Sequence, residues 1–508
     1  MDKYAGAELL DYIESIGATR YQKRDCFDEM TAYLNDDDER ICALYGLRRT
    51  GKTVLMLQAA AEDPNDSLYA TFYPDDTMED LKRMLNDESC PRNVYLDEVT
   101  NIPGFSRLAS VLPIKYVAKE KKRIVIAGTD SYALAIAGMD GLYEKCKFIH
   151  TTYMPYKEYH RLTGHDLDGY IRHGGILAER VNLSDKEQSD RYFRSAILRN
   201  IERSLEGAGR DGEFGALRPF YERGEFSTFI KKIVELSNRS FLARTVNRRF
   251  KSHDFGSLKE LMDKNPDMTD EDFSFLTSEE IRQRLLKALD IKEPLLSYAS
   301  EEAMEQARDY LEWADVIYRV PKSEDVIFIQ PGIRYSQLEA EKEVLEDIDI
   351  PEDTDGNLRA MLKKKLESDI VGQLLEDIVY FQLAKDKAIC KDFNVRKFNG
   401  VTKETGGLRG REVDICLLSK KGRDSYWIEV KNSSEAADGQ LVHLKSPSFQ
   451  DLYREKTGQD VVGEILLYRG KSFKQAEGVL YCNAAEFLCS PREFLEKARD
   501  WLRECGRG

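Results

Sequence analysis

Gly46-Leu47-Arg48-Arg49-Thr50-Gly51-Lys52-Thr53 conforms to the pattern G-x-x-x-x-G-K-[ST], in which backbone N–H groups surround the phosphates of a nucleotide. An apolar run at 41–45 precedes this segment, and a helix-like run at 54–60 follows it. The glycines let the backbone turn toward a phosphate, and the helix N-terminus adds partial positive charge. The sequence therefore predicts an ATP-binding loop whose contacts come from Gly46, Arg48, Arg49, Thr50, Gly51, Lys52 and Thr53.

A second segment, Val94-Tyr95-Leu96-Asp97-Glu98, is an apolar strand that ends in two acids. We expect Asp97 to lie at the carboxyl edge of a sheet, beside the phosphate loop. Lys52 would then reach the β- and γ-phosphates, while the Thr53 hydroxyl and Asp97 would hold Mg²⁺. Glu98 is the candidate general base that polarises the attacking water.

Four short apolar runs alternate with helix-like stretches, which predicts a parallel sheet covered by helices on both faces. After the fourth run comes Gly128-Thr129-Asp130-Ser131. Thr129 or Ser131 is a candidate to sense the γ-phosphate, and a simple helix N-cap explains the same residues equally well. The four runs are 41–45, 68–72, 93–96 and 123–127.

The length of 508 residues suggests two to four domains. We expect the ATPase domain with a helical lead-in at 1–168, a mainly helical lid or winged-helix-like region at 169–345, and a further α/β domain at 346–508. We interpret an acidic segment at 348–356 as the linker between the last two domains. The middle region carries a basic cluster that fits either a solvated helix face or a DNA-contacting helix: Arg239, Arg244, Arg248, Arg249 and Lys251.

Composition and charge exclude several classes of protein. No run of 18 apolar residues occurs, so we expect no membrane span, and the first residues lack the features of a signal peptide. Nine cysteines without a C-x-x-C pair are typical of reduced thiols in a cytoplasmic protein. A net charge of −15 argues against a general nucleic-acid binder, although a local basic face remains compatible with it.

The last predicted domain contains a set of carboxylates beside a lysine. Asp414 lies in one predicted strand, and Glu429 and Lys431 lie in the next. A turn at 420–424 would pair the strands as a hairpin and bring these side chains onto one face. Glu376, on the preceding helix, would add a third carboxylate. Such acids can bind Mg²⁺, and the lysine can stabilise charge on a scissile phosphate. An exposed face with cross-strand salt bridges is the alternative.

At this point the chain resembles the bacterial and archaeal AAA-type ATPases that carry a C-terminal PD-(D/E)xK domain of the restriction-endonuclease-like fold. The resemblance runs nearly from end to end. It rests on the phosphate loop and on segments that match motifs of this family: Leu96-Asp97-Glu98, Gly104-Phe105, 154–159, 170–175, 331–334, Glu412-Val413-Asp414 and Glu429-Val430-Lys431. Leu47 replaces the proline usual in the family, and Gly138-Met139 replaces a Gly-Arg pair.

The resemblance implies ATP and Mg²⁺ as cofactors and supports two hypotheses. In the first, ATP controls DNA cleavage by Asp414, Glu429 and Lys431, with Glu376 as an accessory metal ligand. In the second, the chain is a nucleotide-switched regulatory protein that grips DNA or another protein with an inactive nuclease fold. A plain ATPase that does not act on nucleic acid is a third reading. Assembly into an oligomer is compatible with all three.

Overall fold

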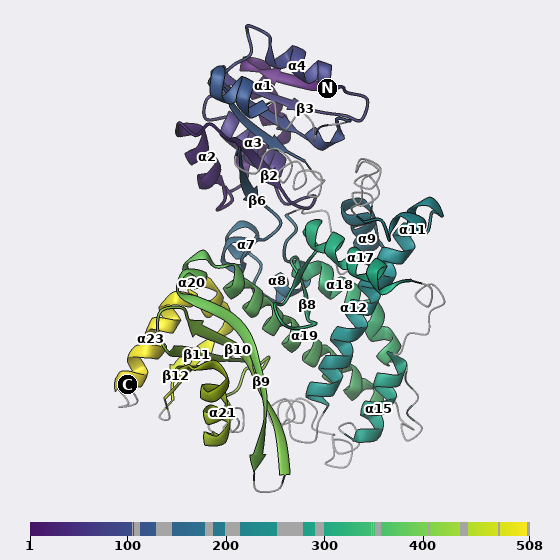
Figure 1. Cartoon of the computed structure of the whole chain (residues 1–508), viewed down its shortest axis with the longest axis vertical. Helices are drawn as coiled ribbons and strands as arrows, with labels where there is room; N and C mark the ends of the chain where they lie inside the picture. Colours follow the sequence, from purple (N-terminus) through teal and green to yellow (C-terminus); the bar gives the residue numbers. More distant parts are fainter. Residues whose placement is uncertain are drawn as a thin grey trace.

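The structure is a computed structural model of the whole chain (Figure 1). It describes residues 1–508 except 104, 106–111, 129–144, 178–185, 199–213, 251–277, 290–298, 347, 349, 351–356, 405–406, 437–445, 476–477 and 505–508. Two six-stranded sheets lie at opposite ends of the molecule, with helices between and beside them. Thr129, Ser131, Gly104, Gly138 and Met139 therefore lie outside the described residues.

The first sheet contains the four predicted strands and has the order β1-β3-β4-β5-β2-β6. Strands β2 to β6 run parallel to one another, so their carboxyl ends meet at one edge. β5 lies between β2, which leads into the phosphate loop, and β4, which ends at Asp97. The bounds are β1 Asp2–Ala5, β2 Ile41–Tyr45, β3 Ser67–Thr71, β4 Asn93–Asp97, β5 Arg123–Ala127 and β6 Cys146–His150.

Helices cover both faces of this sheet. On one face, α1 (Gly6–Ile16), α2 (Phe27–Asn35) and α3 (Lys52–Ala60) share a buried apolar cluster with the strands. On the other face, α4 (Met78–Leu85) packs against a second cluster. This arrangement explains why the strands read as nearly continuous apolar runs, because each strand is buried on both sides.

The lead-in is not wholly helical, which corrects the prediction for the first residues. β1 pairs with β3 in antiparallel fashion and forms an edge of the sheet. Its four residues, Asp2 to Ala5, have no alternating apolar pattern, and three of them are exposed. Backbone pairing with β3 therefore defines the strand, and such pairing leaves little trace in a single sequence.

The middle region is mainly helical, as predicted, with one small antiparallel hairpin of β7 (Ile317–Arg319) and β8 (Val326–Phe328). A winged-helix arrangement stays a prediction. α7 (Tyr156–Thr163) lies within the range predicted for the ATPase domain, and α8 (Leu167–His173) crosses the end of that range. The other described helices are α9 Lys186–Phe193, α11 Arg218–Glu222, α12 Phe226–Arg249, α15 Glu279–Ala288, α17 Glu301–Trp313 and α18 Pro331–Glu346.

The second sheet has the order β13-β14-β12-β11-β10-β9. β9, β10 and β11 form an antiparallel meander, and β12 then joins β11 in parallel after α21 crosses over. The hairpin predicted between the Asp414 and Glu429 strands is formed. The bounds are β9 Phe393–Glu404, β10 Gly407–Ser419, β11 Asp424–Val430, α21 Pro447–Thr457, β12 Asp460–Tyr468, β13 Phe473–Lys474 and β14 Val479–Asn483; α20 (Lys387–Asp392) precedes the sheet, and α22 (Ala484–Cys489) and α23 (Pro491–Glu504) follow it.

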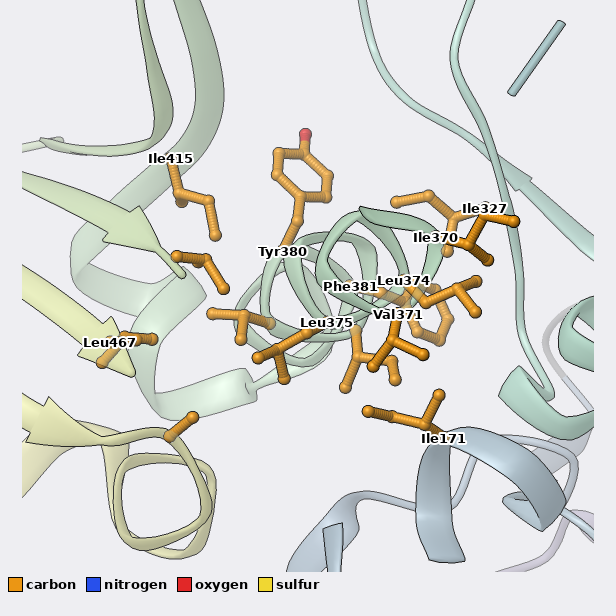
Figure 2. Close-up of a cluster of buried hydrophobic side chains, with 14 of the residues drawn as sticks. Ile171, Ile327, Ile370, Val371, Leu374, Leu375, Tyr380, Phe381, Ile415 and Leu467 are labelled. Carbon is orange, nitrogen blue, oxygen red and sulfur yellow. The ribbon is translucent and has the colours of Figure 1, made fainter. Parts of the chain in front are cut away.

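The helix α19 (Asn357–Lys385) lies between the second sheet and the middle region. Figure 2 shows Ile415 and Leu467 of the sheet on one side of α19, and Ile171 and Ile327 of the middle region on the other. A helix that contacts apolar neighbours on several sides is buried within the molecule. One hydrophobic cluster therefore crosses the predicted boundary at 345/346, and the three domain ranges stay a prediction.

Among the described residues, no helix is both long enough and apolar enough to cross a membrane.

Candidate nucleotide site and carboxylate cluster

The phosphate loop adopts backbone angles that its glycines permit. Gly46 has φ +140° and Gly51 has φ +92°. A Cβ atom at Gly46 would also lie 2.5 Å from Thr151 Oγ1 and 2.8 Å from the backbone N of Thr152. Arg49 has φ +63°, an uncommon conformation for a residue with a side chain that recurs at functional sites. The loop therefore requires glycine where the sequence places it.

Lys52 is buried and folds back onto its own loop. Its Nζ donates to the carbonyl oxygens of Gly46 at 2.7 Å and Leu47 at 2.8 Å. Burial lowers the pKa of the Lys52 ammonium to about 8, although the nearby Glu98 and Asp97 carboxylates oppose this shift. These two hydrogen bonds hold the charged end of Lys52 within the curve of the loop.

Asp97 receives three hydrogen bonds at the edge of the sheet. Thr53 Oγ1 donates to its Oδ2 at 2.6 Å, Tyr69 Oη donates to the same oxygen at 2.8 Å, and the backbone N of Glu98 donates to Oδ1 at 2.9 Å. Burial and then the neighbouring Glu98 raise the pKa of Asp97. The predicted meeting of Thr53 with Asp97 is thus present in the structure. The hydroxyl and carboxylate oxygens that meet here are ligand types that Mg²⁺ accepts.

Tyr69 contacts this site and was not predicted from the sequence. It lies on β3, two residues before Thr71, whose hydroxyl donates to Tyr69 Oη at 3.1 Å. A tyrosine in an apolar strand is typical of a core residue, and only the pairing of β3 with β4 brings it beside Asp97.

Glu98 follows Asp97 directly and has a backbone conformation in the left-handed region, with φ +53°. The chain therefore turns sharply at the candidate general base.

A buried ion pair behind the loop was also missed. Arg24 Nε donates to Glu158 Oε1 at 2.7 Å, and both side chains are almost fully buried. Arg24 Nη1 also donates to the carbonyls of Thr50 and Thr151, each at 2.7 Å. Arg24 thereby connects the lead-in, the phosphate loop, the end of β6 and α7. Its sequence position, in a polar turn 22 residues before the loop, carries no signal of this role.

The middle region contacts the loop from the other side. Tyr192 Oη donates to the carbonyl oxygen of Arg48 at 2.9 Å. The backbone N of Leu177 donates to the carbonyl oxygen of Arg49 at 3.2 Å. Leu47 is buried in a cluster with residues of α9, α11, α12 and α17. The backbone of the loop is therefore held by parts of the chain that the sequence assigns to another domain.

A cleft of about 610 Å³ opens beside the loop. Gly51, Val54 and Gln58 line it from the loop and α3, while Tyr21 comes from the lead-in and His173 from the end of α8. The size is that of a small-ligand site. Its position next to the N-terminus of α3 makes it the candidate place for the base and sugar of a nucleotide.

In the second sheet, Asp414 and Glu429 lie side by side on neighbouring strands. The backbone N of Asp414 donates to Glu429 Oε1 at 3.3 Å, and the backbone N of Val430 donates to Asp414 Oδ2 at 2.9 Å. Lys431 Nζ lies 3.2 Å from Glu429 Oε2. Burial, with the nearby Glu429 and Glu376 charges, raises the pKa of Asp414 well above its ordinary value. The predicted grouping of these three residues is formed.

Glu376 reaches the same region from α19, where two cations meet it. Arg248 Nη1, from α12, lies 3.1 Å from both Glu376 oxygens, and Lys397 Nζ, from β9, lies 2.9 Å from Oε1. Arg248 Nη2 also donates to Glu412 Oε2 at 2.7 Å. Neither Arg248 nor Lys397 was predicted from the sequence to lie beside Glu376.

Three arginines of the predicted basic cluster have acidic partners within the chain. Arg239 pairs with Glu235 and Glu341, and Arg244 pairs with Asp325. With Arg248, they are partly buried and bound to acids of this chain, and a DNA contact by this helix stays a prediction. The side chain of Arg249 and the whole of Lys251 lie outside the described part of the structure.

In the described part of the chain, no three His, Cys, Asp or Glu side chains are arranged so that they could hold a metal ion. The assignment of Asp414, Glu429 and Glu376 as ligands, and that of Thr53 and Asp97, stays a prediction.

Comparison with known proteins places the first sheet in a defined class. Residues 38–160 match a family model described as an AAA domain. This part of the chain is therefore an AAA-type P-loop ATPase domain, and it carries the loop, Asp97 and Glu98 described above. The match covers the N-terminal region alone, and no curated protein matched the chain.

Among solved structures, the chain is similar to a Walker-type ATPase of Pyrococcus abyssi. The identity is 15%, the match covers 62% of this chain and 96% of that one, and the TM-score is 0.27. The RuvB Holliday junction branch migration motor of Thermotoga maritima is 12% identical, with 65% and 97% covered and a TM-score of 0.24. A DNA replication initiation factor is 14% identical, with 66% and 91% covered and a TM-score of 0.20.

Proposed function

We propose that the N-terminal site binds and hydrolyses ATP with Mg²⁺. Lys52 would bind the β- and γ-phosphates, Thr53 and Asp97 would hold Mg²⁺, and Glu98 would orient and deprotonate the attacking water. When bound, Mg²⁺ neutralises charge on the phosphates. The observation that carries this proposal is the 2.6 Å hydrogen bond between Thr53 and Asp97, because it brings a loop hydroxyl and a strand carboxylate to one point.

The 610 Å³ cleft beside Gly51 is our candidate for the adenosine half of the ligand. Val54 and Leu177 offer apolar walls, and His173 and Tyr21 offer rings that can stack on a purine. The loop's backbone N–H groups and the N-terminus of α3 would bind the phosphates at the other end. One continuous site would then contact both halves of the nucleotide.

We further propose that the second sheet carries a metal-dependent nuclease controlled by ATP, with DNA as the substrate. Asp414 and Glu429 supply oxygen ligands on adjacent strands, Lys431 lies beside Glu429, and Glu376 approaches from α19. Carboxylates with a nearby lysine can bind the metal that activates water and can stabilise charge on the phosphate. The direct contact between Asp414 and Glu429 supports this proposal.

The alternative is a nucleotide-switched regulatory protein whose nuclease fold does not cut. Two observations favour it: the net charge of −15, which opposes DNA, and the contact of Arg248 and Lys397 with Glu376. In this case the carboxylates and cations would form a structural ion-pair network. Binding without cleavage is then the expected behaviour.

One experiment separates the two. The purified protein is incubated with linear, circular and single-stranded DNA, with and without ATP, in Mg²⁺ or Mn²⁺, next to an Asp414→Ala variant. The nuclease proposal expects cleavage that Asp414→Ala abolishes, while ATP turnover continues at the wild-type rate because the ATP site lies in the other sheet. Absence of cleavage under every condition, with ATP turnover intact, would favour the regulatory alternative.

A further inference from the structure

The contact between α12 and the carboxylate cluster joins two separate parts of the chain. Arg248 lies one residue before the end of α12, and its guanidinium reaches Glu376 on α19 and Glu412 on β10. Both oxygens of Glu376 lie 3.1 Å from the same Arg248 nitrogen. Glu376 is only 1% exposed, so these contacts are made within the protein interior.

A divalent cation and this guanidinium would compete for the same acid. A cation held by Asp414, Glu429 and Glu376 would need at least one Glu376 oxygen. Both oxygens are within hydrogen-bond distance of Arg248, so the guanidinium charge repels a cation that approaches them. Lys397 also contacts Glu376, but it belongs to the same sheet as Asp414, whereas Arg248 comes from a separate element, α12.

We propose that Arg248 is an autoinhibitory side chain that excludes the divalent cation from the Asp414, Glu429 and Glu376 site while α12 is docked. This inference rests on the proposed nuclease function and names the regulation of that same site. In the docked state Arg248 takes the place of the metal as the positive charge beside Glu376. Undocking of the C-terminal end of α12 removes the guanidinium from both Glu376 oxygens, while Lys397 stays at Oε1.

The position of α12 connects this contact to the nucleotide. Its first half, including Phe226, Phe229 and Ile230, packs in the hydrophobic cluster that also buries Leu47 of the phosphate loop. Its second half, including Phe241 and Val246, packs in the cluster of α19. The 24 residues of α12 span about 36 Å. A change of the loop at one end of this rigid element can therefore move Arg248 at the other.

Binding of Mn²⁺ alone tests the competition. Mn²⁺ is titrated calorimetrically into the full chain without nucleotide, comparing wild type, Arg248→Met and Glu412→Gln, each with and without Asp414→Asn. Methionine retains much of the length of arginine without its charge, and Glu412→Gln weakens the hold on Arg248 without touching the proposed ligands. Arg239→Met is the matched control, because Arg239 lies on the same helix and pairs with Glu341, not with the cluster.

We expect Arg248→Met to bind Mn²⁺ about tenfold more tightly than wild type. Glu412→Gln should show a smaller gain in the same direction, Arg239→Met should show none, and Asp414→Asn should remove each gain. Equal affinity of wild type, Arg248→Met and Glu412→Gln at an Asp414-dependent site would overturn the competition and leave the metal site intact. Absence of any Asp414-dependent Mn²⁺ binding in both variants would instead overturn the proposed metal site itself.

Discussion

At the residue scale, burial of Lys52 lowers the pKa of an ammonium group that is placed to bind a phosphate. The ammonium is held by two carbonyl oxygens of its own loop, and burial lowers its pKa to about 8. A triphosphate offers stronger acceptors than neutral carbonyls, because charge-assisted hydrogen bonds are stronger than those between neutral groups. A bound triphosphate therefore favours the protonated form of Lys52 more strongly than the carbonyl oxygens of the empty loop do.

ATP affinity should consequently fall as the pH rises through the pKa of Lys52. The ammonium is mostly protonated at pH 7 and mostly neutral at pH 9, so binding at pH 9 needs proton uptake and should be about tenfold weaker. Fluorescence titration of a labelled ATP analogue across this range measures the effect. Lys52→Arg should show a flat profile, since guanidinium stays charged. A flat profile in the wild type would contradict the assignment of Lys52 as the phosphate ligand.

Glu98 is the residue whose removal should separate binding from hydrolysis. Glu98→Gln keeps the size of the side chain and removes the proton acceptor, so ATP binding should persist while turnover falls by roughly 10²–10⁴-fold. Measuring the dissociation constant and the steady-state rate on the same preparation gives both quantities. Undiminished turnover would mean that another group activates the water.

At the scale of elements, the phosphate loop is held from behind by the lead-in and α7. Arg24 joins these elements through Glu158 and through the carbonyls of Thr50 and Thr151. A buried ion pair of this kind makes each partner costly to remove singly, because the remaining charge stays in the interior without its counterpart. The pair therefore ties the position of the loop to the packing of two helices.

Arg24→Ala should lower the free energy of unfolding by roughly 3–5 kcal/mol, since Glu158 loses its buried partner. Urea denaturation of the nucleotide-free protein, followed by circular dichroism, measures the change. Lys23→Ala is a suitable control, because Lys23 pairs with Glu62 at the surface and its loss should cost no more than about 1 kcal/mol. If both variants unfold at the same urea concentration, the Arg24 pair does not hold the loop.

At the scale of the whole molecule, two sheets are linked by α12 and α19. The helix α12 contributes to the cluster around Leu47 and to the cluster around α19, so it contacts the surroundings of both candidate sites. If DNA cleavage depends on ATP in the wild type, Arg248→Met should cleave at similar rates with and without ATP, because the autoinhibitory charge is gone. Arg239→Met should retain the ATP dependence. Retention of full ATP dependence by Arg248→Met would show that another element carries the signal.

The sequence alone predicted the elements whose signal is local. The phosphate loop, the strand that ends at Asp97 and the hairpin of Asp414 and Glu429 are encoded by short motifs and by apolar runs within a few residues. The contact of Thr53 with Asp97 followed from one rule, that the carboxyl ends of parallel strands share an edge. The helix that carries Glu376 was also predicted, because its apolar pattern is continuous.

Only the tertiary structure revealed Tyr69 at Asp97, Arg24 behind the loop, β1 at the edge of the sheet and Arg248 at Glu376. Each of these contacts joins residues that are far apart in the chain, and 128 positions separate Arg248 from Glu376. The residues around an arginine on a helix do not indicate which acidic side chain it will pair with. Long-range packing determines the partner, because a charged side chain that becomes buried must lie next to a group of opposite charge.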